Sequence, residues 1–244
     1  MSDIRLALIG MGKMGRALAE LGPQSGFSIV ARLDERETAG GIKPEALNGA
    51  QVAIEFTTPQ SAPRNIKDVV AAGCPIVVGT TGWQADAPDV ERRVRDKQGA
   101  MLVASNFSVG VNIFEQIAAH AARLMANAPG FEAHLVETHH SAKKDAPSGT
   151  AIMLQRAVEP ALGHPVAVSS VRVGSVPGTH EIIFDGHYEQ IRLEHVARDR
   201  RVFAEGALLA ARWLVARKRS GVFTMRDVLS PASGDAVTSE VDRG

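Results

Sequence analysis

The chain has 244 residues, a length that suits one large domain or two smaller ones, each with a buried core. Hydrophobic residues make up 45% of the sequence, and 27 basic side chains balance 27 acidic ones, so that the formal net charge is zero. This balance argues against nucleic acid as the main partner, and the single cysteine excludes both a disulfide within the chain and a thiolate metal cluster.

The amino-terminal segment IRLALIG, residues 4–10, is a short apolar run that ends at glycine, which is typical of a strand and not of a signal peptide. Nowhere does the sequence contain the run of roughly 20 apolar residues that a transmembrane helix needs. We therefore expect a cytoplasmic protein that has no membrane partner.

Short apolar runs alternate with helical patterns up to residue 106. The predicted strands cover residues 4–10, 27–34, 51–56, 75–82 and 100–106, and the predicted helices cover residues 16–21, 60–72 and 89–98. Because Val, Ile and Leu fill these strands almost without interruption, both faces of their sheet should be buried. The alternation therefore predicts a Rossmann-like α/β domain, with a parallel sheet covered by helices on both faces.

The pattern changes after residue 107. Helices are predicted at 111–126 and 150–162, with a strand between them at 131–140, and three β-rich runs follow at 166–174, 179–185 and 188–197. Strands that follow one another without helices predict a mixed or antiparallel sheet, and hence a second domain of α+β type. A further helix is predicted at 204–218, and the small polar residues from 230 to 244 are typical of a loose tail.

The sequence GMGKMG, residues 10–15, has the spacing G-x-G-x-x-G directly after the first predicted strand. In this setting Gly10 permits the tight turn, Gly12 lets the backbone approach a pyrophosphate, and Gly15 lets the helix pack closely on the strand. The start of the helix adds free N–H groups and a partial positive charge for the phosphates. Asp34 ends the second strand, where an acidic residue accepts hydrogen bonds from the ribose hydroxyls.

These residues predict a nicotinamide dinucleotide cofactor. The Asp34 carboxylate favours NADH, because it would face the 2′-phosphate of NADPH with a like charge. However, Lys13, Arg16, Arg32 and Arg36 lie close to it in the sequence, and any of them could pair with that phosphate. The sequence therefore leaves NADH and NADPH both open.

Three later strands of the predicted parallel sheet end in polar sequences: FTTP at 56–59, GTTG at 79–82 and SNFSVGVN at 105–112. Ligands of open parallel sheets bind beyond the carboxyl ends of the strands. We therefore expect the rest of the dinucleotide to lie there, with its nicotinamide near residues 79–82 and Asn106.

The sequence ETHHSAKKDAPSGT, residues 137–150, concentrates groups that bind anions and groups that transfer protons. Ser148 is a predicted N-cap, so the helix that follows should begin at Gly149 and Thr150. A helix start that exposes hydroxyl and N–H groups is a ready site for a carboxylate. The stretch therefore predicts a receptor for an anionic substrate.

His139 and His140 add groups that titrate near neutral pH, and Lys143 and Lys144 add positive charge. Adjacent residues of an extended segment point to opposite sides, so we expect only one of the two histidines to face the reaction. We expect no metal ion, since no cysteine and no close cluster of carboxylates joins the histidines.

The motif ETHHSAKKDAPSGTA closely resembles the signature of the dihydrodipicolinate reductase (4-hydroxy-tetrahydrodipicolinate reductase) family. The segments GMGKMGR, VGTTG, NFSVGVN, RVGSVPGTHEI and FAEGALLAARWL also resemble their family counterparts, so the likeness covers most of the chain. The long motif is highly specific, whereas the glycine loop is not. The resemblance implies NAD(P)H-dependent reduction of 4-hydroxy-tetrahydrodipicolinate, a cyclic dicarboxylate, to tetrahydrodipicolinate in diaminopimelate and lysine biosynthesis.

The resemblance also implies roles for individual residues. His139 and Lys143 match the catalytic positions, with the proton donor left open between them. The residues that match the binders of the substrate carboxylates are His140, Ser148, Gly149 and Thr150. Together with the strand ends, the expected cofactor-binding residues are Gly10, Gly12, Lys13, Met14, Gly15, Asp34, Gly79, Thr80, Thr81, Ser105, Asn106 and Phe107. Lys144 stands at a variable position and receives no role.

Family members are usually homotetramers assembled through the sheet of the second domain, which is also our expectation for this chain. We accordingly place the dinucleotide-binding domain at 1–107 and 203–244, and the substrate-binding and oligomerisation domain at 108–202. One departure from the family pattern is Thr58, where arginine is common before the proline. It again leaves the choice between NADH and NADPH open.

Two alternatives remain. One is another two-domain NAD(P)-dependent dehydrogenase on the same cofactor fold, of the amino-acid type. The other is a non-catalytic module that senses dinucleotides, which would have no need for the cluster of His139, His140 and Lys143.

Overall fold

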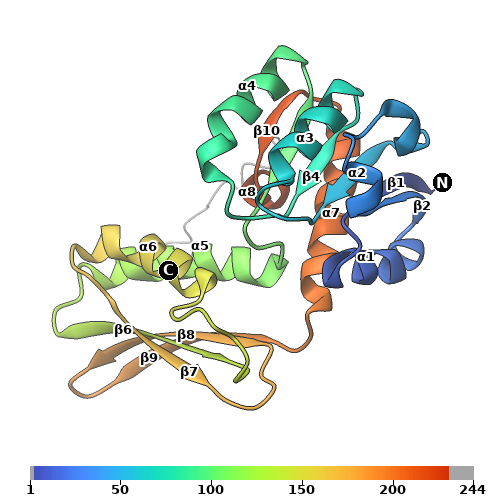
Figure 1. Ribbon diagram of the computed structural model, residues 1–244. Helices are drawn as coiled ribbons and strands as arrows, with labels where there is room; N and C mark the ends of the chain where they lie inside the picture. Colours follow the sequence, from blue (N-terminus) through green and yellow to red (C-terminus); the bar gives the residue numbers. More distant parts are fainter. Residues whose placement is uncertain (1–2, 231–244) are drawn as a thin grey trace.

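Two separate β-sheets organise residues 3–230, the part of the chain that the computed structural model describes (Figure 1). The larger sheet has six strands in the order β10-β5-β4-β3-β1-β2. The smaller sheet has four strands in the order β7-β6-β8-β9. The first sheet belongs to a Rossmann-like unit and the second to an α+β unit, as the sequence predicts.

All neighbouring strands of the larger sheet run parallel. Every residue of its central strands β3 and β4 is buried, which explains why these strands show no polar alternation. The strands are β1 (Ile4–Ile9), β2 (Phe27–Leu33), β3 (Val52–Glu55), β4 (Ile76–Val78), β5 (Ala100–Val103) and β10 (Gly221–Phe223).

Helices cover both faces of this sheet, because successive strand residues point to opposite faces. Ala7 and Ile9 of β1 pack toward α3 (Ala62–Ala71) and α4 (Ala87–Asp96). Leu6 and Leu8 belong to the other core cluster, with α1 (Lys13–Gln24) and α7 (Arg201–Arg217). The shorter helices are α2 (Glu35–Thr38), η1 (Pro44–Leu47), η2 (Gln84–Asp86) and α8 (Met225–Leu229).

The sixth strand, β10, was not expected from the sequence, which predicts five strands for this sheet. Its residues Gly221–Phe223 pair with Ala100–Leu102 of β5, far earlier in the chain. A strand of three residues is too short to show a periodic pattern, and its partner is not a sequence neighbour. Only the packing of α7 across the sheet brings the chain back to this edge.

The smaller sheet is mixed: β6 (Phe131–His139) runs parallel to β7 (Ala167–Arg172) and antiparallel to β8 (Gly178–Gly186), which pairs antiparallel with β9 (Gln190–Ala197). Two helices, α5 (Val109–Met125) and α6 (Gly149–Leu162), cover one face of it. Figure 1 shows no element of the described chain on the other face. Apolar side chains exposed on that face include Val171, Val173 and Val196.

Helix α7 returns the chain from β9 to the larger sheet, where it contacts β3, β4 and β5. Residues 231–244, for which a loose tail is expected, lie outside the described residues. Within residues 3–230 no helix combines the length and the apolar character needed to cross a membrane. The cytoplasmic location stays a prediction.

Candidate active site

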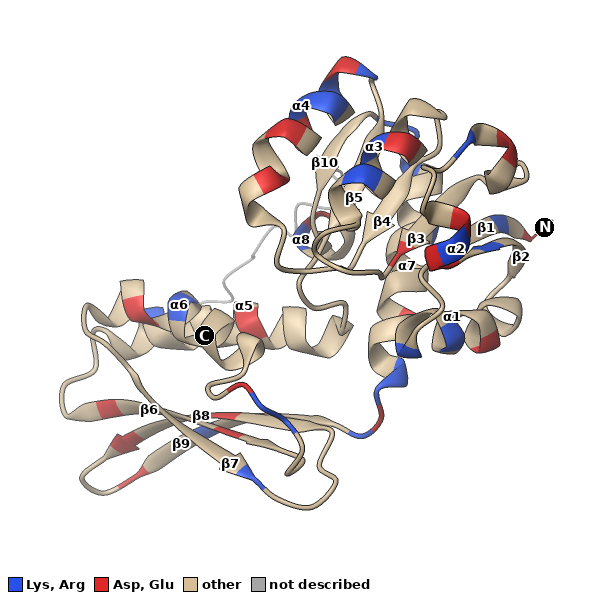
Figure 2. Cartoon of the chain, in the orientation of Figure 1, with Lys and Arg blue, Asp and Glu red and all other residues tan. Residues whose placement is uncertain are grey.

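A cavity of about 580 Å³ lies between the two sheets and is lined from both sides. Loops after β4 and β5 meet the segment between β6 and α6 there, and this volume suits a small-molecule ligand. Charged residues gather on the loop before α6 and on the segment that joins β9 to α7 (Figure 2). Of the expected site residues, those that line the cavity are Thr81, Ser105, Asn106, His139, His140, Lys143, Ser148, Gly149 and Thr150.

The start of helix α6 forms one wall of this cavity. The Ser148 hydroxyl accepts a hydrogen bond from the backbone N–H of Ala151 at 3.1 Å, which confirms the predicted N-cap. A Cβ atom added to Gly149 would meet none of the described residues within 4 Å, so these residues leave the first turn open to a ligand. The N–H groups of this turn therefore offer an accessible anion site.

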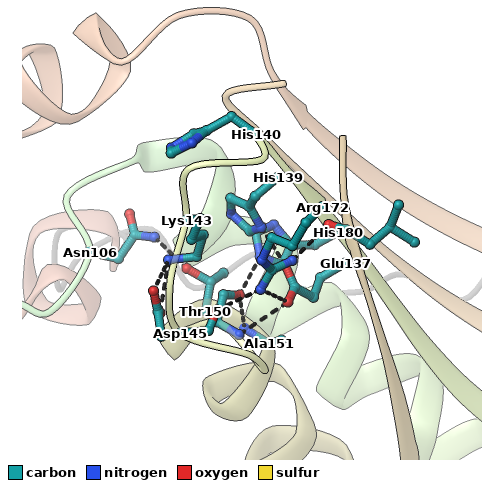
Figure 3. Close-up of polar contacts among 12 residues, drawn as sticks. Asn106, Glu137, His139, His140, Lys143, Asp145, Thr150, Ala151, Arg172 and His180 are labelled. Atoms are coloured by element: carbon teal, nitrogen blue, oxygen red, sulfur yellow. Dashed lines mark hydrogen bonds and ion pairs between the residues drawn. The ribbon is translucent and has the colours of Figure 1, made fainter. Parts of the chain in front are cut away.

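A buried network is centred on Glu137 and includes His139, which lines the cavity (Figure 3). The Glu137 side chain is fully buried, and one of its oxygens accepts a hydrogen bond from Nδ1 of His139. The other oxygen accepts hydrogen bonds from Arg172 Nη2 at 2.6 Å and from the backbone N–H of Ser148 at 3.2 Å. Glu137 and Arg172 were not expected from the sequence, although residues two apart on a strand share a face, which places Glu137 beside His139.

The charge states within this network follow from burial and hydrogen bonding. Burial alone would raise the pKa of Glu137, but hydrogen bonds from Arg172, Ser170 and His139 outweigh it and lower the pKa to about 2. Burial lowers the pKa of His139, although Glu137 opposes the shift. At neutral pH a charged carboxylate therefore accepts the Nδ1–H of a neutral imidazole, whose Nε2 keeps its lone pair.

His180 of β8 completes the network. Its ring lies edge-on to that of His139 with centroids 5.1 Å apart, and its Nε2 lies 3.1 Å from the Ser148 hydroxyl. Potential ligand atoms of Glu137, His139 and His180 lie within 4.8 Å of one another, a spacing that metal sites also show. Here the guanidinium of Arg172 already supplies the positive charge against the carboxylate. One carboxylate, that of Glu137, thus lies close to the histidines, and the absence of a metal ion stays a prediction.

Lys143 and His140 lie on the loop that closes the cavity. Lys143 Nζ contacts both oxygens of the Asp145 carboxylate at 2.8 Å, and the carbonyl of Asp145 accepts a hydrogen bond from Arg172 at 2.6 Å. His140 Nε2 lies 2.7 Å from Nη2 of Arg200. Both adjacent histidines line the cavity, because β6 ends at His139 and the chain turns at His140. That only one of them faces the reaction stays a prediction.

Two lining residues, Arg200 and Phe203, were not anticipated from the sequence. They lie where the chain crosses from β9 into α7, so they reach a site formed mainly by residues far earlier in the chain. A signal for them would have been the boundary between the two predicted domains, since ligands often bind at such junctions. Lys144, to which no role was given, is not among the lining residues.

A second cavity, of about 290 Å³, lies over the carboxyl ends of β1, β2 and β3. Within the described part of the chain, a Cβ atom on Gly12 would meet nothing within 4 Å, whereas a Cβ on Gly10 would lie 2.0 Å from the carbonyl oxygen of Phe56. A Cβ on Gly15 would lie 2.0 Å from the carbonyl oxygen of Gly10. The tight turn, the open approach and the close helix packing are thus all present, and they fit a dinucleotide phosphate at the start of α1. The lining residues are Gly10, Gly12, Asp34, Glu35, Thr38, Phe56, Thr57, Thr58 and Ser61.

The remaining expected cofactor residues lie outside these two cavities. Met14 and Phe107 pack into the core cluster on the α1 side of the sheet. Gly79 leaves room for the ring of Phe56, since a Cβ atom at position 79 would lie 2.0 Å from Cε1 of that ring. Lys13 lines a more open cavity beside His140. Their cofactor contacts stay predictions.

Thr80 takes part in a second buried network, centred on Glu55 at the end of β3. Oε1 of Glu55 accepts hydrogen bonds from the backbone N–H of Thr57 at 3.0 Å and from the Thr80 hydroxyl at 3.1 Å. Its Oε2 is buried and has no hydrogen-bond partner among residues 3–230, and burial raises the pKa of this carboxyl. Glu55 thus joins the loops that follow β3 and β4, on which the cofactor is expected.

Comparison with known proteins covers both parts of the chain. The family model for the dihydrodipicolinate reductase N-terminus matches residues 4–107, and the model for its C-terminus matches residues 110–229. The 4-hydroxy-tetrahydrodipicolinate reductase of Christiangramia forsetii is 33% identical over 241 residues, covering 93% of this chain and 98% of the relative. That of Methanoregula boonei is 32% identical over 252 residues, covering 89% and 94%.

A solved structure shares the fold. The dipicolinate-bound dihydrodipicolinate reductase from Paenisporosarcina sp. TG-14 has a TM-score of 0.78 and 21% sequence identity, and the match covers 93% of this chain and 100% of that one. At this identity the likeness shows the architecture, while the family matches and the sequence relatives carry the assignment. This chain therefore belongs to the dihydrodipicolinate reductase family.

Proposed function

We propose that this chain reduces 4-hydroxy-tetrahydrodipicolinate to tetrahydrodipicolinate with a reduced nicotinamide dinucleotide, in diaminopimelate and lysine biosynthesis. The observation that carries the proposal is the cavity in which His139, Lys143 and the start of α6 face the strand-end loops of the dinucleotide-binding unit. Two relatives that bear this activity in their names match at least 89% of the chain. An amino-acid dehydrogenase or a dinucleotide sensor would not require this cluster.

The two substrate carboxylates can be held by different groups of the cavity. The open first turn of α6 offers N–H groups and the hydroxyl of Thr150 to one carboxylate. Lys143, His140 and Arg200 line the same cavity and offer positive or polar groups to the other. The bound dipicolinate in the structure from Paenisporosarcina, a ring with two carboxylates, supports a ligand of this class.

The reaction also needs a proton. Conversion of the hydroxylated ring to tetrahydrodipicolinate also releases the 4-hydroxyl group as water. When bound, the reduced nicotinamide would supply a hydride to C4 of the dehydrated ring. Lys143 brings N–H donors to the cavity, and His139 becomes a donor once its Nε2 has taken up a proton. Proton transfer from such a positioned group contributes about 10²–10⁴-fold to the rate, and held carboxylates keep the ring in place for it.

We propose that the cofactor is preferentially NADH. The cavity beside Gly12 is lined by the carboxylates of Asp34 and Glu35 and by no Lys or Arg among its lining residues. Oδ1 of Asp34 also accepts a hydrogen bond from the backbone N–H of Met11 at 3.2 Å, which fixes its position. A 2′-phosphate would meet two like charges there, whereas ribose hydroxyls would find acceptors.

We also propose a homotetramer. The sheet face opposite α5 and α6 exposes Val171, Val173 and Val196, and no described element covers it. Apolar side chains on an open sheet face favour association with another copy. Light scattering on the purified chain tests this, and a monomer at micromolar concentration would reject it.

A coupled assay tests the reaction. The substrate is generated freshly by condensing pyruvate with aspartate semialdehyde, and oxidation of NADH and of NADPH is followed in separate runs. We expect turnover that depends on the condensation product and is faster with NADH. Oxidation of amino acids with no reduction of this product would favour the other dehydrogenase, and cofactor binding without turnover would favour the sensor.

A further inference from the structure

We infer that Glu137 is a positioning residue, whose carboxylate fixes the tautomer and orientation of the His139 ring and stabilises the imidazolium that this ring becomes when it acts as the acid. The inference rests on the function proposed above. It assigns a role to a residue that the resemblance to the family leaves without one.

The Glu137 carboxylate binds residues from three parts of the site: its own strand β6, strand β7 and the start of α6. Its carboxylate accepts hydrogen bonds from His139, from Arg172 and from the N-cap residue Ser148, and no part of its side chain is exposed. A buried group with this many partners has a single arrangement available to it. The His139 ring is therefore held by Nδ1 and turns Nε2 away from the carboxylate.

Gly178 lies next to the other side of the His139 ring. A Cβ atom on Gly178 would lie 3.0 Å from Nε2 of His139, so the glycine leaves room beside this nitrogen. His139 lines the cavity with the loop that carries Lys143. Nε2 is thus the ring nitrogen available for proton transfer, since Nδ1 is already bound to Glu137.

Four charged or titratable groups face His139 from the surrounding elements. They are Glu137 on its own strand, Arg172 on β7, His180 on β8 and Lys143 on the following loop. Burial lowers the pKa of His139, and the positive charges of Lys143 and Arg172 lower it further, whereas Glu137 raises it. The carboxylate is therefore the group that favours a protonated ring.

His139 gives up one proton in the proposed step and later takes one back from water. The imidazolium of His139 gives the proton on Nε2 to the ring atom that has gained electron density, so that one N–H bond breaks and one bond to hydrogen forms. The proton on Nδ1 stays in its hydrogen bond to Glu137. Water then returns a proton to Nε2.

The first test needs only the unaltered chain. Solid-state NMR of protein labelled with nitrogen-15 in histidine separates the two neutral tautomers, and the His139→Gln variant identifies the signal of His139. We expect Nδ1 to carry the proton at neutral pH. A ring protonated at Nε2 in the neutral form would overturn the inference, whether or not the chain has activity.

The second test removes the negative charge of Glu137 and the positive charge of Arg172 in separate variants. Glu137→Gln should lower kcat by about 10–100-fold and move the basic limb of the kcat pH profile to lower pH, because the ring loses the charge that favours its protonation. Arg172→Gln should move that limb to higher pH. Glu132→Gln removes a carboxylate from an exposed position of the same strand and should change neither quantity.

Two readouts separate positioning from loss of structure or of function. Thermal melts identify unfolded variants, and NADH affinity should be the same in all folded ones. Shifts of the same sign in Glu137→Gln and Arg172→Gln, or no shift in either, would overturn the inference. Failure of the unaltered chain to reduce the substrate would instead reject the proposed function, and the tautomer measurement would still decide the role of Glu137.

Discussion

Nδ2 of Asn106 donates a hydrogen bond to the hydroxyl of Thr150 at 3.1 Å, joining the loop after β5 to the first turn of α6 across the cavity. Oδ1 of Asn106 accepts from the backbone N–H of Ser108 at 2.8 Å, so the donor is itself held in place. The expected cofactor loop and the expected carboxylate site are therefore in direct contact. We expect a substitution at Thr150 to weaken substrate binding more than cofactor binding.

Thr150→Val removes the hydroxyl and keeps the shape of the side chain. We expect KM for the substrate to rise about 2- to 10-fold, the cost of one hydrogen bond, with little change in NADH affinity. Thr150→Ser retains the hydroxyl and should restore most of the difference. Steady-state kinetics with each variant provide the measurement, and a valine variant with unchanged KM would show that the hydroxyl does not contact the substrate.

Replacing His139 and Lys143 together by Ala should lower kcat by at least about 10²-fold, because both candidate proton donors are lost. We expect the adenosine and pyrophosphate of NADH to lie over the ends of β1 to β3, so most cofactor contacts should persist and the dissociation constant should be nearly unchanged. Fluorescence titration with NADH measures this. Loss of cofactor binding equal to the loss of turnover would contradict the division of labour between the two cavities.

Asp34→Asn keeps an oxygen acceptor for the N–H of Met11 and removes the negative charge. We expect the preference for NADH over NADPH, measured as the ratio of kcat/KM values, to fall by about 5- to 10-fold, since a hydrogen bond to a charged acceptor becomes a neutral one. Glu45→Gln, an exposed residue outside the cavity, is the control. A ratio that the Asp34 variant leaves unchanged would place the selectivity elsewhere.

Burial lowers the pKa of His180 from 6.5 to about 4, so the unfolded chain binds its proton more readily than the folded one. The resulting stability is present above pH 6.5 and is lost as the pH falls toward 4, by up to about 3 kcal/mol. Urea denaturation across this range should show the loss. His180→Gln should flatten it and the exposed His164→Gln should not, and equal slopes in all three proteins would disprove the assignment.

Glu55→Ala removes the acceptor that joins the loops after β3 and β4. We expect the free energy of unfolding to fall by about 1–3 kcal/mol and the NADH dissociation constant to rise, because Thr57 and Thr80 lose a shared partner. Glu55→Gln keeps an acceptor without a charge and should be much milder. Lower stability with unchanged NADH binding would show that the network supports the fold alone.

The sequence by itself determined the features that depend on neighbouring residues. The alternation of apolar runs with helical patterns specifies the parallel sheet. A strand that is buried on both faces has apolar side chains at nearly every position, and its own sequence shows them. The glycine spacing likewise lies within residues 10–15, although the contact that restricts Gly10 comes from Phe56, just after β3. Ser148 caps α6 through a hydrogen bond to a residue three positions later, so its role was visible in the local sequence.

Only the tertiary structure decided which distant groups share the site. Arg172 reaches Glu137 because β7 pairs with β6 in a register that places Arg172 opposite His139. The same holds for β10 at the edge of the larger sheet and for Arg200 beside His140. The charge states of Glu137 and His139 depend on burial and on Arg172 of β7, and both are set by how the strands pair and pack.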